Sequence, residues 1–146
     1  RGDYAKAGLA VEIQEPADPN DPPKLAAAGR VDIAIGYQPQ AMMLIDKGVP
    51  VARVGALVPT PLNSVMVLAD GPVRSLADLR GRRTGYSVSG FEDALLGAML
   101  ASAGLKQSDV RLINVNFSLA PSLLSGQVDA VIGAFRNYET HQMVLK

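Results

Sequence analysis

Hydrophobic and polar residues alternate with two different periods along this chain, and the period changes several times. Leu9, Val11 and Ile13 alternate with small or polar residues, which predicts a strand with one buried face. Residues 31–36 are instead nearly all apolar, which is typical of a strand covered on both faces, as in a parallel sheet. Further strands are expected at residues 51–58, 64–69, 83–86, 110–115 and 128–133.

Short helices are expected between these strands because capping residues and glycines bracket them. Asp21 can cap a helix that starts at Pro22. The clearest helical stripe of apolar residues ends at Gly104, and Ser89 and Glu92 before it have the spacing of a capping box. The remaining helices are expected at residues 39–47, 75–79 and 119–125.

Alternating strands and helices predict the α/β class with a mainly parallel sheet. Residues 28–36 and 125–133 repeat Gly, Val, Asp, Ile and Gly at identical spacing. This repeat favours two similar small lobes, although turn chemistry alone can also produce such joints between helix, glycine and strand. We therefore expect a partial first lobe at 1–70, a second lobe at 71–135, and the start of a crossover back to lobe one at 136–146.

The composition narrows the possible functions. The chain has 14 basic and 14 acidic residues, and neither half is strongly basic, so nucleic-acid binding has little support. With no cysteine, disulfides, thiolate catalysis and cysteine metal sites are excluded. The only histidine is His141, which makes histidine-rich metal sites improbable, and no apolar run approaches the ~20 residues of a membrane span.

The two ends of the sequence suggest a piece of a longer protein. It starts at Arg1 without an initiator methionine or a signal-peptide pattern. The first residues read as the end of a helix that stops at Gly8, and the last six stop within a pattern that has no cap.

Polar residues follow the predicted strands, where ligands bind in open α/β sheets. They are mostly Ser, Asn, Tyr, Gln and Glu, which can orient a polar ring or amide but do not form a catalytic set. Together, the runs at residues 16–23, 37–39, 85–92, 114–118 and 124–139 resemble the thiamine-pyrimidine-precursor binding proteins. These are solute-binding components of ABC importers, and they are related to alkanesulfonate-binding proteins and to yeast pyrimidine synthase.

The resemblance implies a type II periplasmic-binding fold, in which two lobes close on a small ligand by a hinge movement. It also implies a membrane permease as partner, a periplasmic or extracellular location, and no enzyme activity, cofactor or metal. In that family a further strand precedes the equivalent of Arg1, and the chain returns to lobe one after the equivalent of Glu139. Lobe one is therefore expected to be incomplete, with unpaired strand edges that a second copy fills in a homodimer, by swapping if need be.

The same resemblance suggests roles for aromatic and acidic residues. Glu139 can accept hydrogen bonds from the exocyclic amine of an aminopyrimidine, or can be a solvated residue at a helix start. Tyr37, Phe117 and Tyr138 can stack on the ring, or can simply pack. Arg136 can pair with Glu139 or Asp129, or contact the ligand.

Polar groups complete the expected ligand site. Asn63 and Asn116 can bind ring nitrogens or a formamide, or can cap loops. Ser87, Ser89 and Gly90 precede a helix N-terminus that offers free N–H groups, whereas the capping box alone also explains Ser89. The candidate ligand residues are Tyr37, Gln38, Asn63, Ser87, Ser89, Gly90, Glu92, Asn116, Phe117, Arg136, Tyr138 and Glu139.

Three other functions stay open at this stage. The chain can bind another small solute, such as a sulfonate, a nitrile-like compound or a flavin precursor. It can be a folded remnant that binds nothing. An enzyme is disfavoured because the yeast relative uses a histidine and a cysteine-rich iron site, and because no Gly-x-Ser-x-Gly elbow for a serine nucleophile is present.

Overall fold

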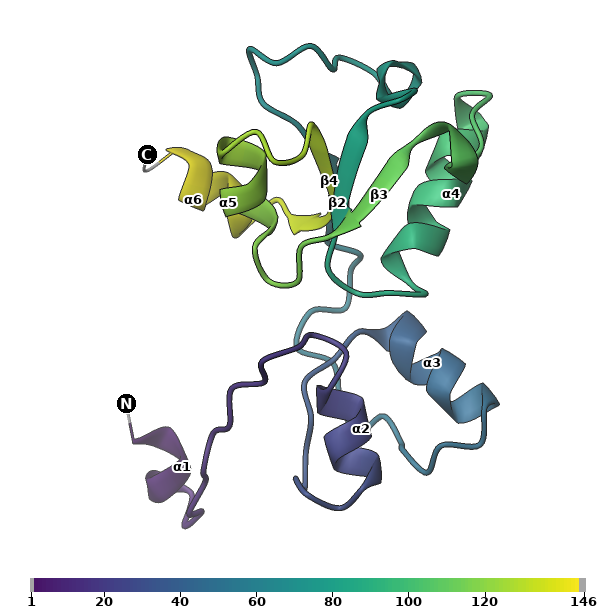
Figure 1. Ribbon diagram of the computed structural model, residues 1–146. Helices are drawn as coiled ribbons and strands as arrows, with labels where there is room; N and C mark the ends of the chain where they lie inside the picture. Colours follow the sequence, from purple (N-terminus) through teal and green to yellow (C-terminus); the bar gives the residue numbers. More distant parts are fainter. Residues whose placement is uncertain (1, 145–146) are drawn as a thin grey trace.

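The computed structural model describes residues 2–144 and shows a layered α/β domain joined to an N-terminal part that contains only helices and extended chain (Figure 1). The strands are β1 (Asn63–Met66), β2 (Arg83–Tyr86), β3 (Arg111–Asn114) and β4 (Ala130–Phe135). The helices are α1 (Asp3–Lys6), α2 (Pro22–Ala27), α3 (Gln38–Asp46), α4 (Glu92–Ser102), α5 (Leu119–Leu124) and α6 (Glu139–Val144), with 3-10 turns at Leu76–Leu79 and Gln107–Asp109.

The sheet is mixed, with the strand order β1-β4-β2-β3. β2 runs parallel to both β3 and β4, as the alternation of strands and helices predicted. β1 runs antiparallel to β4. The sequence grouped residues 64–69 with the first lobe, whereas β1 forms an edge of the sheet that was expected to begin at residue 71.

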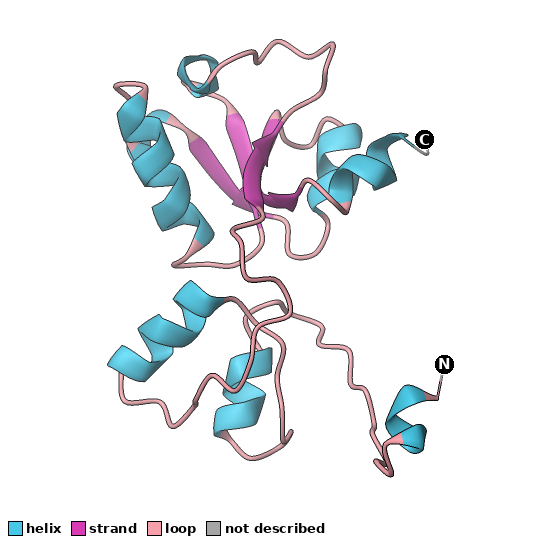
Figure 2. Ribbon diagram, turned by 180° about the vertical axis from the view of Figure 1, so that it is seen from behind, coloured by secondary structure: helices cyan, strands magenta, loops and turns pink. Residues whose placement is uncertain are grey.

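Helices cover both faces of this sheet (Figures 1 and 2). On one face, Leu96 and Leu100 of α4 pack against Ile132 of β4 in a fully buried cluster. On the other face, Leu123 of α5 packs with Val131 of β4, and α6 lies beside α5. The sheet is thus the middle of three layers, an arrangement that buries apolar side chains on both of its faces.

A bulge at Gly133 interrupts β4. Ser64 and Val65 of β1 face Ala134 and Ile132, so Gly133 between them has no partner in β1. Its φ is +94°, a left-handed conformation that favours glycine. The extra residue changes the alternation of side chains, because Ala134 packs on the same face as Val131.

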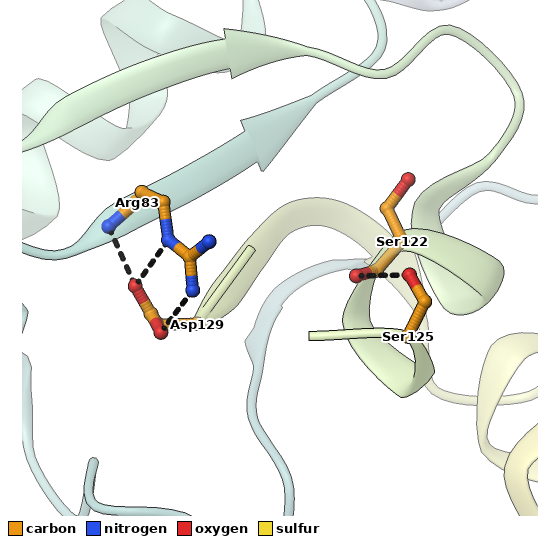
Figure 3. A network of polar contacts seen from close by, with 4 residues as sticks. All are labelled: Arg83, Ser122, Ser125 and Asp129. Carbon is orange, nitrogen blue, oxygen red and sulfur yellow. Dashed lines mark hydrogen bonds and ion pairs between the residues drawn. The ribbon is translucent and has the colours of Figure 1, made fainter. Parts of the chain in front are cut away.

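An ion pair joins the first residue of β2 to the turn before β4 (Figure 3). Nε and Nη2 of Arg83 donate to the two carboxylate oxygens of Asp129 at 3.1 and 2.9 Å, and the backbone N–H of Arg83 donates to the same carboxylate at 2.9 Å. These hydrogen bonds lower the pKa of Asp129. Asp129 therefore pairs with Arg83, and the expected pair with Arg136 is not formed. In the same view, Ser125 Oγ donates to the Ser122 carbonyl at the end of α5.

The N-terminal part contains α2 and α3 where the sequence placed them, but the strands expected at 9–13, 31–36 and 51–58 are wrong. Within residues 2–62 the structure has no strand. These segments have no partner to complete a backbone ladder, and their apolar side chains stay exposed, as at Ile33 (74%) and Val54 (87%). The alternating pattern identifies a segment whose side chains suit a strand, but a strand forms only when a second strand pairs with it.

Truncating the core should show which part of the chain carries the stability. We expect Leu96→Ala to lower the free energy of unfolding by about 2–5 kcal/mol, because it leaves a cavity against β4. Leu57 is 82% exposed, so Leu57→Ala should change the free energy of unfolding by less than about 0.5 kcal/mol. Urea unfolding followed by circular dichroism measures both variants. Equal losses of unfolding free energy would contradict the conclusion that the sheet domain, and not the N-terminal part, carries the stability.

Candidate functional site

A cavity of about 210 Å³ opens at the carboxyl ends of β2 and β4. Ligands of open α/β sheets bind beyond the carboxyl ends of the strands. Polar and aromatic groups from separate elements converge on it. Its walls are formed by Tyr37, Ser87, Phe117, Leu119, Ala120, Pro121, Gly133, Phe135, Tyr138, Glu139 and Gln142.

The sheet and its flanking helices hold most of these residues in place. Ser87 directly follows β2, and Phe135 is the last residue of β4. Glu139 begins α6, and its Oε2 accepts a hydrogen bond of 2.6 Å from the backbone N–H of Phe135. This bond orients the Glu139 carboxylate next to the end of β4. The carboxylate carries negative charge into a cavity that is otherwise lined by neutral groups.

Tyr37 comes from the N-terminal part, directly before α3, and packs between two aromatic rings. Its ring centroid lies 5.8 Å from that of Phe91 and 5.9 Å from that of Phe135, the second pair edge-to-face at 75°. Both distances are typical of favourable aromatic pairs. Burial raises the pKa of Tyr37, and the negative charges of Glu92 and Glu139 raise it further. Tyr37 thus stays neutral at physiological pH and offers the cavity an aromatic ring.

Two further aromatic rings line the cavity and remain open to solvent. Phe117 and Tyr138 are 58% and 59% exposed. Large aromatic side chains gain free energy from burial, so rings left open beside a cavity are suited to cover a flat ligand.

Glu92 lies behind the cavity wall and is fully buried. Its Oε2 accepts hydrogen bonds from the backbone N–H groups of Ser87 and Val88, at 2.7 and 3.1 Å. Ser87 Oγ donates to the same carboxylate at 3.0 Å. Burial raises the pKa of Glu92, against the opposing effect of these hydrogen bonds. The carboxylate therefore fixes the turn between β2 and α4 and places Ser87 in the wall of the cavity.

The bulge at Gly133 makes room for this carboxylate. A Cβ atom built on Gly133 would collide with the Glu92 carboxylate. The two residues come from α4 and β4, so this close approach joins the helix to the strand at the base of the cavity. Ser89 does not form the expected capping box with Glu92, because the Glu92 carboxylate accepts from Ser87 and Val88 instead and Phe91 is the N-cap.

Five of the twelve candidate ligand residues line the cavity: Tyr37, Ser87, Phe117, Tyr138 and Glu139. Glu92 contributes indirectly through Ser87. Ser89 lines a separate cavity of about 170 Å³, together with residues of α2 and α3 such as Lys24 and Gln40. The structure thus brings together about half of the predicted set.

The other candidates lie outside both cavities. Gln38 accepts a hydrogen bond from Arg53 at 3.1 Å, and Gly90 is exposed beside Met43. Asn63 is half-buried in β1, opposite Phe135.

Asn116 and Arg136 are exposed on loops of the sheet domain. The Asn116 backbone N–H donates to the side chain of Asn114, with φ of 48° at Asn116. Arg136 forms no ion pair with Glu139 among the described residues; one oxygen of the Glu139 carboxylate instead accepts from the backbone N–H of Phe135.

Gly133, Phe135 and Gln142 line the cavity although the candidate set omitted them. Phe135 could have been found, because it is the last residue of the apolar run that forms β4. Gly133 is the last glycine of the repeated Gly-Val-Asp-Ile-Gly pattern, and the structure places the Glu92 carboxylate against it. Gln142 lies one helical turn beyond Tyr138. The sequence could have indicated Gln142 only if the helix that starts at Glu139 had been extended past that residue.

No cluster of His, Cys, Asp and Glu side chains within residues 2–144 could hold a metal ion. None of the helices in that range has both the length and the apolar character that a membrane crossing requires.

Comparison with known families adds the decisive observation. The family model described as NMT1/THI5 like matches residues 1–146, which is the whole chain. The chain belongs to the NMT1/THI5-like family. This match confirms the family resemblance that the five sequence runs indicated.

Curated relatives of this chain carry names that refer to thiamine or to a pyrimidine. The chain is 60% identical over 146 residues to a protein of Haemophilus influenzae named as a thiamine biosynthesis protein, covering 100% of this chain and 46% of that protein. It is 39% identical over 138 residues to the formylaminopyrimidine-binding protein of Halalkalibacterium halodurans, covering 94% and 42%. It is 30% identical over 133 residues to the 4-amino-5-hydroxymethyl-2-methylpyrimidine phosphate synthase of Schizosaccharomyces pombe, covering 91% and 38%. The chain thus spans less than half the length of these relatives.

Solved structures confirm the fold class for this NMT1/THI5-like chain. The periplasmic aliphatic sulphonate-binding protein SsuA of Escherichia coli matches with a TM-score of 0.72 at 18% identity, covering 98% of this chain and 50% of that one. The alkanesulfonate-binding protein SsuA of Xanthomonas axonopodis matches with a TM-score of 0.71 at 21% identity, covering 88% and 45%. At such identities the likeness shows a periplasmic-binding fold, and the partial coverage agrees with an incomplete lobe.

The packing of Gly133 against Glu92 can be tested with one added methyl group. We expect Gly133→Ala to lower the free energy of unfolding by at least about 2 kcal/mol, because its φ is left-handed and its Cβ meets the carboxylate. Gly97 in α4 has open space around it, so the matched control Gly97→Ala should keep or raise stability by up to about 1 kcal/mol. Thermal unfolding of both variants measures the difference, and an unchanged Gly133→Ala protein would refute the close contact.

The raised pKa of Glu92 predicts a specific pH dependence. A carboxyl group with a raised pKa in the folded state adds stability below its unfolded pKa, and this stability is lost as the pH rises through the folded value. We therefore expect Glu92→Gln to gain stability relative to the parent chain as the pH rises from acid to neutral. Urea unfolding of both proteins at a series of pH values measures the difference, and a difference that stays constant or shrinks with pH would contradict the assignment.

Proposed function

We propose that this chain is part of the substrate-binding protein of an ABC importer and that its cavity holds a thiamine pyrimidine precursor. The observation that carries the proposal is the meeting of Tyr37, Phe117, Tyr138 and Glu139 around one cavity at the carboxyl ends of β2 and β4. Aromatic rings recognise the faces of a flat heterocycle, and a carboxylate accepts hydrogen bonds from its exocyclic amine.

The state of Glu139 supports this assignment. One of its oxygens, Oε2, accepts the N–H of Phe135, which fixes the plane of the carboxylate. Among residues 2–144 the other oxygen, Oε1, has no hydrogen bond within the chain, so it can accept from a ligand. Ser87 and Gln142 supply further polar groups to the same cavity, for ring nitrogens or a formamide.

The charge of the cavity favours an aminopyrimidine over a sulfonate. A sulfonate requires cationic or N–H-rich surroundings because its charge must be neutralised when it is buried. The described residues that line the cavity include the acidic Glu139 but neither lysine nor arginine. A neutral or weakly basic ring fits this wall better. The name of the Halalkalibacterium halodurans relative, a formylaminopyrimidine-binding protein, points to the same ligand class.

A permease partner and a location at the periplasmic or extracellular face follow from the same proposal. Synthase activity is the second candidate, because the Schizosaccharomyces pombe relative at 30% identity is named as a synthase. The chain itself supplies no cysteine and one histidine for such chemistry, and His141 is exposed on α6. We infer binding without catalysis.

Isothermal titration with formylaminopyrimidine tests the proposal. We expect saturable binding to the parent chain, and about ten- to a hundredfold weaker binding to Glu139→Gln, because a hydrogen bond to a charged acceptor is lost. Glutamine keeps an oxygen for the Phe135 N–H, so the loop should stay in place.

The matched control is Glu15→Gln, an exposed carboxylate in the proline-rich loop, which should bind as the parent does. The sulfonate buffer MOPS should give no heat of binding. Binding of MOPS but not of the pyrimidine would overturn the ligand assignment. Formation of a pyrimidine phosphate by the chain when no pyrimidine has been added, detected by mass spectrometry, would favour the synthase.

A further inference from the structure

The fold fixes the direction in which the Ser87 hydroxyl can form hydrogen bonds. Ser87 lines the cavity, and the residue is only 4% exposed. Its Oγ lies 3.0 and 3.1 Å from the two carboxylate oxygens of Glu92. A hydroxyl has one proton to donate and two lone pairs that accept, whereas an ionised carboxylate can only accept. The Ser87 proton is therefore committed to Glu92, and only the lone pairs of this hydroxyl remain for a ligand.

Glu92 retains this proton because its buried charge has few other partners. Its side chain is fully buried, and among the described residues no lysine or arginine forms an ion pair with it. The backbone N–H groups of Ser87 and Val88 donate to Oε2 at 2.7 and 3.1 Å, which favours the ionised carboxylate. Oε1 accepts from the Ser87 hydroxyl at 3.0 Å. Turning this hydroxyl toward a ligand would leave a buried carboxylate oxygen without its donor, which is costly.

We propose that Ser87 acts toward the ligand only as a hydrogen-bond acceptor and that Glu92, as a positioning residue, imposes this direction. The inference rests on the proposed function, in which the free oxygen of Glu139 accepts from the exocyclic amine. Formylaminopyrimidine has a second donor, the formamide N–H, and this group is then left for Ser87. The cavity thus selects ligands that bring an N–H or O–H to this position.

Other polar groups of the cavity wall do not impose such a choice. The Gln142 amide has both donors and an acceptor, and the Tyr138 hydroxyl can act as either. Selectivity for donors therefore comes from the two groups that can only accept, the Glu139 carboxylate and the Ser87 hydroxyl. A ligand that places an acceptor against Ser87 would leave two buried acceptors facing each other with no proton between them.

Isothermal titration with a matched pair of ligands tests this inference. The first ligand is formylaminopyrimidine, and the second is the corresponding formate ester, in which an oxygen atom replaces the formamide N–H. Mildly alkaline buffer favours the ionised Glu92 carboxylate. We expect the parent chain to bind the ester about ten- to a hundredfold more weakly than the formamide, because the ester has no proton for Ser87.

Two variants separate the acceptor from the residue that imposes its direction. Ser87→Ala removes the acceptor, so the two ligands should bind within about twofold of each other. Glu92→Gln keeps an oxygen for the two backbone N–H groups, which turns the new NH₂ group toward Ser87 Oγ. The Ser87 proton is then free for a ligand, so the preference for the formamide should also fall to within about twofold. A purely structural role of Glu92 would weaken both ligands equally and leave their ratio unchanged.

Ser125→Ala and Asp93→Asn are the matched controls. Ser125→Ala removes a hydroxyl of the sheet domain that donates to a backbone carbonyl, and Asp93→Asn removes the negative charge next to Glu92 in the first turn of α4. Neither residue lines the cavity, so both variants should keep the preference of the parent chain. Circular dichroism shows whether each variant is folded, and Ser87→Ala alone decides if Glu92→Gln does not fold.

The outcomes distinguish this inference from the proposed function. A parent chain that binds neither ligand would refute both together. Equal binding of formamide and ester by the parent chain would refute the inference and leave the proposed function standing. A folded Ser87→Ala or Glu92→Gln variant with the preference of the parent chain would do the same.

Discussion

The buried carboxylate of Glu92 determines the local structure on which the candidate site is built. A charged group without solvent requires several hydrogen bonds, and Glu92 obtains them from the two backbone N–H groups of the turn after β2 and from the hydroxyl of Ser87. The same carboxylate occupies the space where a side chain at position 133 would stand. One acidic group thus fixes the turn, the start of α4 and the bulge of β4.

The cavity depends on this arrangement because it positions three of the residues that line the cavity. Ser87 lies in the wall because its hydroxyl and backbone bind Glu92, and Gly133 lies there because the bulge turns the strand aside. Phe135 follows the bulge and holds Glu139 through its backbone N–H. The carboxylate that we propose as the ligand acceptor is thus positioned, through β4, by a second carboxylate that does not reach the ligand. Tyr37 adds the contact from the N-terminal part.

The sequence predicted the sheet domain well and the N-terminal part poorly, for a physical reason that the repeated motif shows. Residues 28–36 and 125–133 have the same pattern. In each case a helix precedes the segment and is followed by a glycine with a left-handed backbone conformation, Gly29 or Gly126. Only the second motif continues into a strand, because β1 and β2 lie on either side of β4. Local pattern and glycine positions fix helix ends and strand tendency, whereas pairing depends on neighbours far along the chain. The candidate site shows the same limit. Glu139 and Tyr37 were predicted from the family resemblance and line the cavity, but the link from Glu92 through Gly133 required the fold.

The central claim is that this cavity, and not the one beside Ser89, receives an aminopyrimidine. Two-dimensional NMR of the labelled chain during titration with 4-amino-5-aminomethyl-2-methylpyrimidine tests it most directly, because every backbone amide reports separately. The account predicts saturating shifts at Ser87, Phe135 and Glu139, with little change at Gln40 and Lys47 near the other cavity. Shifts confined to Gln40, Lys47 and Ser89, or an unchanged spectrum at saturating ligand, would contradict it.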